Sequence, residues 1–318
     1  MDIYGIQLEI MLVLLGVAGL LVNVCSPRLS VRQIAGILAG LVGVLFLYSL
    51  MMQPVPAPLF GGLCVLDGSA LFFKQLLLAG TGVALLLAMD SPSIRAQGAE
   101  FFSLMLFAAA GMLLLVSVND FICLFVALET VTLCFYVLTA FPTGGPRPPG
   151  AVVSNRDAVV LEAGIKYLVM GAVSASLTIY GISYIYGATG HTGFEAVREN
   201  MMQAGGTAAA YRFGFLLVLL GVGFKLAMVP LQLWAPDVYQ GAPTPATAFL
   251  ASCSKVAGFV LLLRLIHAGL LPPGRDSLIL IGVLAGITLL YGTLGALAQM
   301  DLKRLLGYSS IAHAGYLL

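Results

Sequence analysis

Three ionisable residues lie inside apolar stretches of this chain: Glu129, Lys225 and Lys255. A charge in the hydrocarbon of a bilayer costs free energy, so residues of this kind are retained where they carry out a function. A buried lysine holds its proton less tightly than a lysine in water, and a nearby carboxylate restores that hold. A glutamate and two lysines on three different helices therefore predict a path for protons. The alternative is a static buried ion pair that only fixes helix packing.

The stretch that follows Lys225 is expected to break its helix. Pro230 comes five residues later, and proline removes a backbone hydrogen bond and clashes with the preceding turn. The turn-rich segment Gly241 to Pro245 then leads into the next apolar run. A broken helix at membrane depth is tolerated where it lines a cavity or is buried in protein. Lys225 beside such a break resembles the ion sites of transporters.

Other ionisable residues allow two interpretations. Lys166 is expected near the inner end of its helix, where it forms an ion pair with Glu162, four residues earlier, or takes part in the proton path. His313 is a relay or a core histidine. Lys74 and Arg264 are expected near helix ends, where long basic side chains reach toward the interface.

The elements that must position these residues are membrane-spanning helices. The chain is 60% hydrophobic and 9% charged, far below the charged content of a soluble domain. About 20 apolar residues cross a bilayer. We expect an all-α polytopic membrane protein of about ten helices, the seventh of them discontinuous. The predicted helices are Leu8–Val24, Ile34–Met52, Ser69–Met89, Ala99–Val118, Phe121–Phe141, Lys166–Tyr186, Phe213–Pro230, Pro245–His267, Ser277–Gln299 and a tenth that begins near Lys303.

The composition also argues against several functions. The net charge is +1 without a basic block, so the sequence predicts no nucleic-acid partner. The five cysteines form no C-x-x-C pair, and neither a dinucleotide-binding glycine motif nor metal-ligand spacing occurs. We therefore expect no cofactor, no metal and no redox site in this chain.

Basic residues in the connections predict the orientation. They are concentrated in alternate connections, which places the N-terminus outside, because the cytoplasmic side holds the excess of lysine and arginine. The basic residues on the predicted inner side are Arg28, Arg32, Arg95, Arg147, Arg156, Lys303 and Arg304.

A repeated hinge divides the predicted helices. Helix four runs into helix five through Asn119-Asp120, and helix nine runs into helix ten through Met300-Asp301. An odd number of helices, five, separates the two hinges, as an inverted-topology repeat requires. We expect three regions: helices one to three in 1–98, a first antiporter-like repeat in 99–270, and the start of a second, truncated repeat in 271–318.

Four stretches of the chain are similar to one family of membrane subunits. They are NDFICLFVALETVTLCFYVL (119–138), EAGIKYLVMGAVSASLTIYGISYIYG (162–187), KLAMVPLQLWAPDVYQGAPTP (225–245) and KRLLGYSSIAHAGY (303–316). The sequence resembles subunit N of proton-translocating NADH-quinone oxidoreductase, respiratory complex I, over nearly its whole length. The family continues beyond helix ten, so we expect further helices after Leu318.

The resemblance implies roles for the residues above. Glu129 and Lys225 would form a coupling pair, Lys255 would pass the proton inward, Lys166 would be accessory, and His313 would lie on the bridge to a second half-channel. NADH, FMN, iron-sulfur clusters and quinone would be bound by partner subunits. The partners would be neighbouring antiporter-like and small membrane-arm subunits and lipids, in a bacterial inner membrane.

Two further functions remain open at this point. One is a stand-alone or multisubunit cation/proton antiporter built from the same repeat, and the other is a proton-inert subunit that anchors the membrane arm. LDGSALFFKQLLL, residues 66–78, resembles subunit N more than the antiporters, which favours the respiratory assignment.

Overall fold

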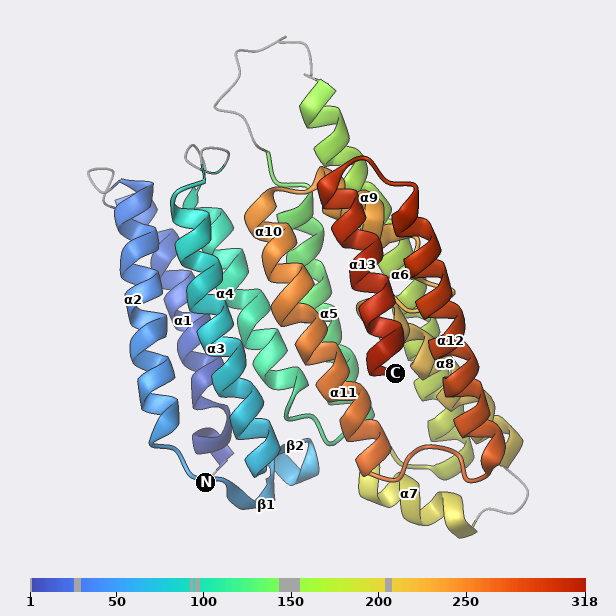
Figure 1. Cartoon of the computed structure of the whole chain (residues 1–318). Coiled ribbons are helices and arrows are strands. Elements are labelled where there is room, and N and C mark those ends of the chain that lie inside the picture. Colours follow the sequence, from blue (N-terminus) through green and yellow to red (C-terminus); the bar gives the residue numbers. More distant parts are fainter. Residues whose placement is uncertain (1, 26–29, 92–93, 95–97, 143–154, 204–207) are drawn as a thin grey trace. The chain divides into compact units, whose positions relative to one another are not determined.

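The computed structural model describes residues 2–25, 30–91, 94, 98–142, 155–203 and 208–318. Its elements are helices except for one short hairpin (Figure 1). In chain order they are α1 (Asp2–Cys25), α2 (Val31–Leu50), β1 (Val55–Leu59), a 3-10 turn (Phe60–Gly62), β2 (Cys64–Leu66), α3 (Gly68–Met89), α4 (Gly98–Leu115), α5 (Phe121–Thr139), α6 (Asn155–Thr189), α7 (Phe194–Gln203), α8 (Ala208–Leu226), α9 (Trp234–Gly241), α10 (Thr244–Phe249), a π-helical turn (Leu250–Ser254), α11 (Lys255–His267), α12 (Arg275–Leu297) and α13 (Leu302–Leu317).

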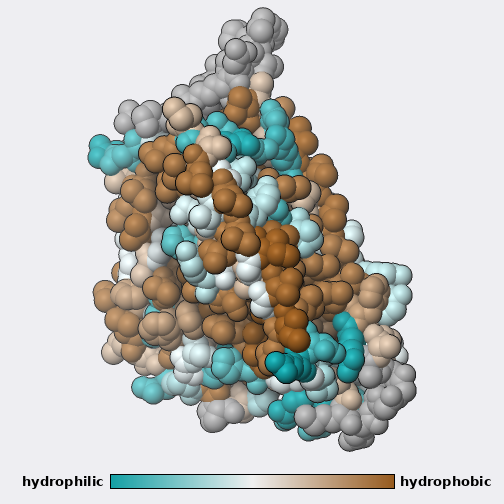
Figure 2. Space-filling model, turned by 45° about the vertical axis from the view of Figure 1, so that its right-hand side comes forward, coloured by the Kyte–Doolittle hydropathy of each residue, from teal (hydrophilic) through white to brown (hydrophobic). Residues whose placement is uncertain are grey.

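Within the described ranges, nine helical spans are long and apolar enough to cross a membrane. They coincide with the first nine predicted helices, and the tenth is α13, whose 16 residues are fewer than a typical span contains. On the face shown in Figure 2, hydrophobic side chains cover a broad middle band, and hydrophilic ones gather toward its two ends. Leucines on α12 such as Leu290 and Leu294 are mostly exposed, as side chains that meet lipid should be.

Three predicted connections contain more structure than expected. The predicted loop 53–68 contains the antiparallel hairpin β1–β2, because alternating prolines around Val55 cannot continue a helix but fit an extended strand. The predicted loop 142–165 ends in the first turns of α6, which begins at Asn155 and not at Lys166. The connection 187–212 contains α7 and the start of α8. Arg28, Arg95 and Arg147, on which the orientation partly rests, lie outside the described residues.

The chain divides into two compact units. The first contains Met1–Ser117, Ala127–Ile165 and Gly241–Ala257, and the second contains Val118–Val126, Lys166–Gln240 and Gly258–Leu318. Each unit is therefore assembled from separated segments, and α5, α6, α9 and α11 each contribute residues to both.

The first unit encloses an ion pair that the sequence did not predict. Lys74 on α3 was expected to reach the interface, but its side chain is fully buried, with Nζ 2.6 Å from Glu9 Oε1 on α1. The ammonium also donates to the Gly5 carbonyl at 2.9 Å. The snorkelling prediction for Lys74 was wrong, because a carboxylate on another helix supplies a counter-charge inside the bundle.

Small residues bring helices of the second unit close together. A Cβ added at Gly181 of α6 would lie 2.6 Å from the Gly214 carbonyl oxygen of α8. Gly292 of α12 faces the Ala312 backbone of α13 in the same way, and a Cβ added there would overlap the Ala312 amide nitrogen. Backbones approach this closely in membranes where side chains are small, because packing and not water drives helix association there.

Candidate functional site

Lys225 lies in the last turn of α8 and is 2% exposed. A Cβ added at Gly258 of α11 would come within 3.3 Å of Lys225 Cγ. The aliphatic part of the lysine therefore packs against a glycine that leaves room for it. The structure places this predicted site residue in the protein interior, immediately before an interruption of its helix.

The interruption after Lys225 is the predicted discontinuity of helix seven. The helix ends at Leu226, and Ala227 adopts a left-handed conformation with φ 57°. The Val229–Pro230 peptide is cis, and regular helix resumes at Trp234. A non-glycine residue in the left-handed region is strained by about 1–2 kcal/mol. Such strain is found where the surrounding structure holds it in place, and often at functional sites.

Hydrogen bonds satisfy several of the backbone groups that the break releases. The Phe224 carbonyl accepts from the Ala227 amide at 3.0 Å and from the Trp234 indole Nε1 at 3.1 Å. The Val229 amide donates to Thr288 Oγ1 of α12 at 3.1 Å. A non-helical segment at membrane depth needs such partners, because hydrocarbon offers none. The break is therefore a defined structure with its own partners.

Three aromatic rings pack together beside the break. The ring centroids of Tyr167 on α6 and Trp234 on α9 are 4.8 Å apart, and Phe224 on α8 lies 5.3 Å from Tyr167 and 5.2 Å from Trp234. All three residues are buried. Phe224 directly precedes Lys225 in the sequence, and rings at such distances attract one another. The sequence alone did not reveal this cluster.

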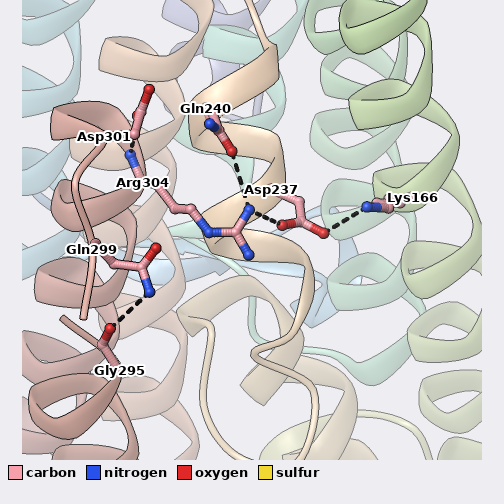
Figure 3. Close-up of polar contacts among 7 residues, drawn as sticks. All are labelled: Lys166, Asp237, Gln240, Gly295, Gln299, Asp301 and Arg304. Carbon is pink, nitrogen blue, oxygen red and sulfur yellow. Dashed lines mark hydrogen bonds and ion pairs between the residues drawn. The ribbon is translucent and has the colours of Figure 1, made fainter. Parts of the chain in front are cut away.

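Lys166 takes part in an ion-pair network centred on Asp237 (Figure 3). Its Nζ lies 2.7 Å from Asp237 Oδ2, while Arg304 Nη1 lies 2.6 Å from Asp237 Oδ1. The same Arg304 nitrogen donates to Gln240 Oε1 at 3.0 Å. Lys166 of α6, Asp237 of α9 and Arg304 of α13 thus meet at one carboxylate (Figure 3).

The network corrects the expected position of Lys166. Because α6 begins at Asn155, Lys166 is not at the end of its helix, and it forms an ion pair with Asp237, which lies 71 positions later in the chain. Asp237 and Arg304 were not predicted as site residues. The signal for Asp237 was its position after the break. Nothing in the sequence indicated that Arg304 would reach it.

Glu129 and Lys255 lie in the first unit, on α5 and α11. Glu129 is half-buried, and Lys255 is 8% exposed. Lys255 directly follows the π-helical turn Leu250–Ser254, which sequence reasoning missed. Turns of this kind in α-helices occur frequently at functional sites. Because Lys225 belongs to the second unit, the Glu129–Lys225 coupling pair remains a prediction.

His313 lies on α13 and is exposed, with its ring centroid 5.9 Å from that of Tyr316. The described part of the chain therefore does not bury this side chain. Ser310, one turn earlier, forms a 3.2 Å hydrogen bond with the Tyr239 hydroxyl of α9. A place for His313 in a relay remains a prediction.

A metal site is not evident in the part of the chain that the structure describes, where no three histidine, cysteine, aspartate or glutamate side chains form a cluster. The groups that gather here are cations, carboxylates and hydroxyls on membrane helices. Their chemistry is the binding, transfer and release of protons.

Comparison with known proteins places this arrangement in a family. At 36% identity, the chain resembles NADH-quinone oxidoreductase subunit N of Heliobacterium modesticaldum, with 98% of this chain and 63% of the relative covered. It resembles a chain of respiratory complex I from Thermus thermophilus with TM-score 0.76 and 32% identity, covering 97% of this chain and 62% of that one.

A third similarity concerns the fold alone. A chain of the Mrp complex from Dietzia sp. matches with TM-score 0.78 and 24% identity, over 98% of this chain and 33% of that chain. The chain thus spans less than two thirds of the length of the relatives that it matches. Residues 117–318, which hold Lys225, Lys255 and the Asp237 network, match the profile described as NADH:quinone oxidoreductase/Mrp antiporter, TM, and the chain belongs to that family.

Proposed function

We propose that this chain is the proton-translocating part of a membrane-arm subunit of a bacterial NADH-quinone oxidoreductase, in the inner membrane. The observation that carries the proposal is the buried Lys225 at the end of α8, followed by a strained helix break whose backbone is held by hydrogen bonds to Trp234 and Thr288. The H. modesticaldum relative is an NADH-quinone oxidoreductase subunit N, which supports the respiratory assignment.

In the proposed mechanism, Lys225 binds and releases the translocated proton at Nζ, and Glu129 supplies a carboxylate that favours the charged form when it is near. Opposite charges about 4 Å apart attract by about 4 kcal/mol at an effective dielectric constant near 20. A change in that separation therefore changes the proton affinity of the lysine strongly. Lys255 passes the proton inward, Lys166 is accessory, and His313 leads toward a second half-channel.

We further propose that the free energy for this movement comes from partner subunits. NADH, FMN, iron-sulfur clusters and quinone would be bound there, and this chain would contribute no redox site of its own. Other membrane-arm subunits, both antiporter-like and small ones, and lipids would be its partners.

The inverted repeat is part of the same proposal, with regions 1–98, 99–270 and 271–318. At each of the two hinges an aspartate side chain caps the helix that follows. Asp120 accepts from the Ile122 and Cys123 amides at the start of α5, at 2.7 and 3.2 Å. Asp301 accepts from the Arg304 amide at the start of α13, at 2.9 Å. An aspartate that caps a helix directly after a short hinge supports a common origin of the two helix pairs.

The direct test compares proton uptake by everted membrane vesicles during NADH oxidation. The variant is Lys225→Ala in the full-length subunit within the assembled complex. Arg275→Ala is the matched control, because Arg275 is an exposed basic residue at the start of α12. We expect Lys225→Ala to lose most of its proton uptake and Arg275→Ala to keep it. Normal uptake with Lys225→Ala would overturn the proposal and favour the inert anchor.

A cation/proton antiporter is the second candidate, because the fold also matches a chain of the Mrp complex. The two functions differ in their driving force. Under the respiratory proposal, vesicles that contain the complex take up protons when NADH is supplied, and an imposed sodium gradient alone moves none. Proton movement driven by the sodium gradient, and lost in Lys225→Ala, would favour the antiporter.

A further inference from the structure

The short helix α9 is held by neighbours on two sides within the second unit. It follows the break after Lys225, and Asp237 lies in its first turn. On one side Asp237 pairs with Lys166 of α6, and on the other it pairs with Arg304 of α13. Figure 3 shows the carboxylate between the two cations.

The contact between α9 and α13 extends beyond the ion pair. Gln240 accepts a second hydrogen bond from Arg304, and Tyr239 is bonded to Ser310. A Cβ added at Gly307 would lie 2.9 Å from Pro236 Cα, so the two backbones touch at this point. The segment after the break is thus attached to α13 along its length.

The two cations that share Asp237 differ in chemistry. A guanidinium stays protonated in proteins, whereas a lysine ammonium gives up its proton when its surroundings change. Arg304 therefore gives the carboxylate a partner whose charge is permanent. Among charged groups, Lys166 faces Asp237 on α9, and Glu162 lies one turn earlier on α6 itself.

We propose that Asp237 is a positioning residue that joins the helix break beside Lys225 to α13 through Arg304. Because one carboxylate binds cations of α6 and α13, a movement of α9 is transmitted to α13, which lies in the proposed second repeat. In this way α9 couples the first half of the proton path to the second. This inference rests on the proposed function and adds two residues to it.

The experiment measures protons taken up per NADH oxidised, in vesicles that contain the assembled complex. The variants are Asp237→Asn, Arg304→Gln, Arg304→Lys and the double variant Asp237→Asn/Arg304→Gln. Arg275→Gln is the control, because it removes an arginine charge from an exposed position. Lys225→Ala is measured beside them.

We expect Asp237→Asn and Arg304→Gln each to lower the ratio by about threefold or more, within the range seen for residues that modulate coupling. The double variant should be no worse than the poorer single one, because both changes remove the same ion pair. Arg304→Lys should keep more than about half of the ratio, since both bonds from Arg304 use one nitrogen and a point charge can replace it. A purely structural arginine would not be rescued by charge alone.

Two results distinguish a failure of this inference from a failure of the proposed function. A normal ratio in Asp237→Asn and Arg304→Gln, with loss in Lys225→Ala, would overturn this inference and leave the proposed function intact. Full uptake in Lys225→Ala would overturn the proposed function itself. Should Asp237→Asn not assemble, Arg304→Gln decides in the same way, because it removes the same ion pair from the other helix.

Discussion

The buried ion pair between Glu9 and Lys74 leads to a quantitative prediction about stability. Lys74→Met replaces the cation by an apolar side chain of similar length. The change leaves the buried Glu9 carboxylate of α1 without its counter-charge on α3. We expect this single substitution to destabilise the chain far more than the loss of an ordinary surface lysine.

The expected loss of stability in Lys74→Met follows from the geometry of the ion pair. The side chain of Lys74 is fully buried, that of Glu9 is 9% exposed, and the charged atoms are 2.6 Å apart. Their attraction at an effective dielectric constant near 20 is about 6 kcal/mol, much of which offsets the cost of removing both charges from water. Breaking one side of such a pair costs about 3–5 kcal/mol. Loss of the bond to the Gly5 carbonyl adds about 1 kcal/mol.

The assay is the denaturant-induced unfolding of the purified chain in detergent, for wild type, Lys74→Met, Glu9→Gln and the double variant. The double variant should recover most of the lost free energy, because an amide and a thioether leave no unpaired charge. A cost below about 1 kcal/mol for Lys74→Met, as measured for exposed ion pairs, would refute the reasoning and restore the snorkelling interpretation.

The remaining predictions concern charge, packing and strain. Glu129→Gln should reduce proton uptake by vesicles severely and Glu129→Asp less so, and equal uptake in wild type and Glu129→Gln would rule out a role by charge. Gly292→Leu should separate α12 from α13 and lower the free energy of unfolding by about 1–3 kcal/mol, because overpacking forces a shift of the Ala312 backbone. An unchanged denaturation midpoint in this variant would contradict the close approach of the two helices. Ala227→Gly should raise the same free energy by up to about 1 kcal/mol, since glycine adopts φ 57° without strain, and a loss of stability would count against strain at the break.

Features that depend on local sequence were predictable. Apolar runs of the right length located the membrane helices, since the bilayer imposes one solvent and one thickness on all of them. Pro230 located the break in helix seven, because proline acts on its own turn. The places of Lys225 and Lys255 within helical spans followed from the same runs, and both side chains are buried.

Features that depend on tertiary contacts were not predictable. Lys74 lies near the end of its helix, where a lysine usually reaches toward the interface. Its burial depends on the Glu9 carboxylate of α1, with which it forms an ion pair. Asp237 and Arg304 are 67 positions apart, 304 minus 237, and no sequence period relates them. The π-helical turn before Lys255 lies in an apolar run without proline or a glycine pair to mark it. Such features arise when helices that are distant in sequence pack together.

Replacement of Lys225 by arginine tests most directly whether the lysine works by binding and releasing a proton. Arginine keeps the positive charge but does not give up its proton. The measurement is NADH-driven proton uptake by vesicles that contain the complex with Lys225→Arg, beside wild type and Lys225→Ala. We predict that Lys225→Arg loses proton uptake as completely as Lys225→Ala while the complex still assembles. Wild-type uptake in Lys225→Arg would show that a fixed charge is sufficient at this position, and would contradict proton transfer through Lys225.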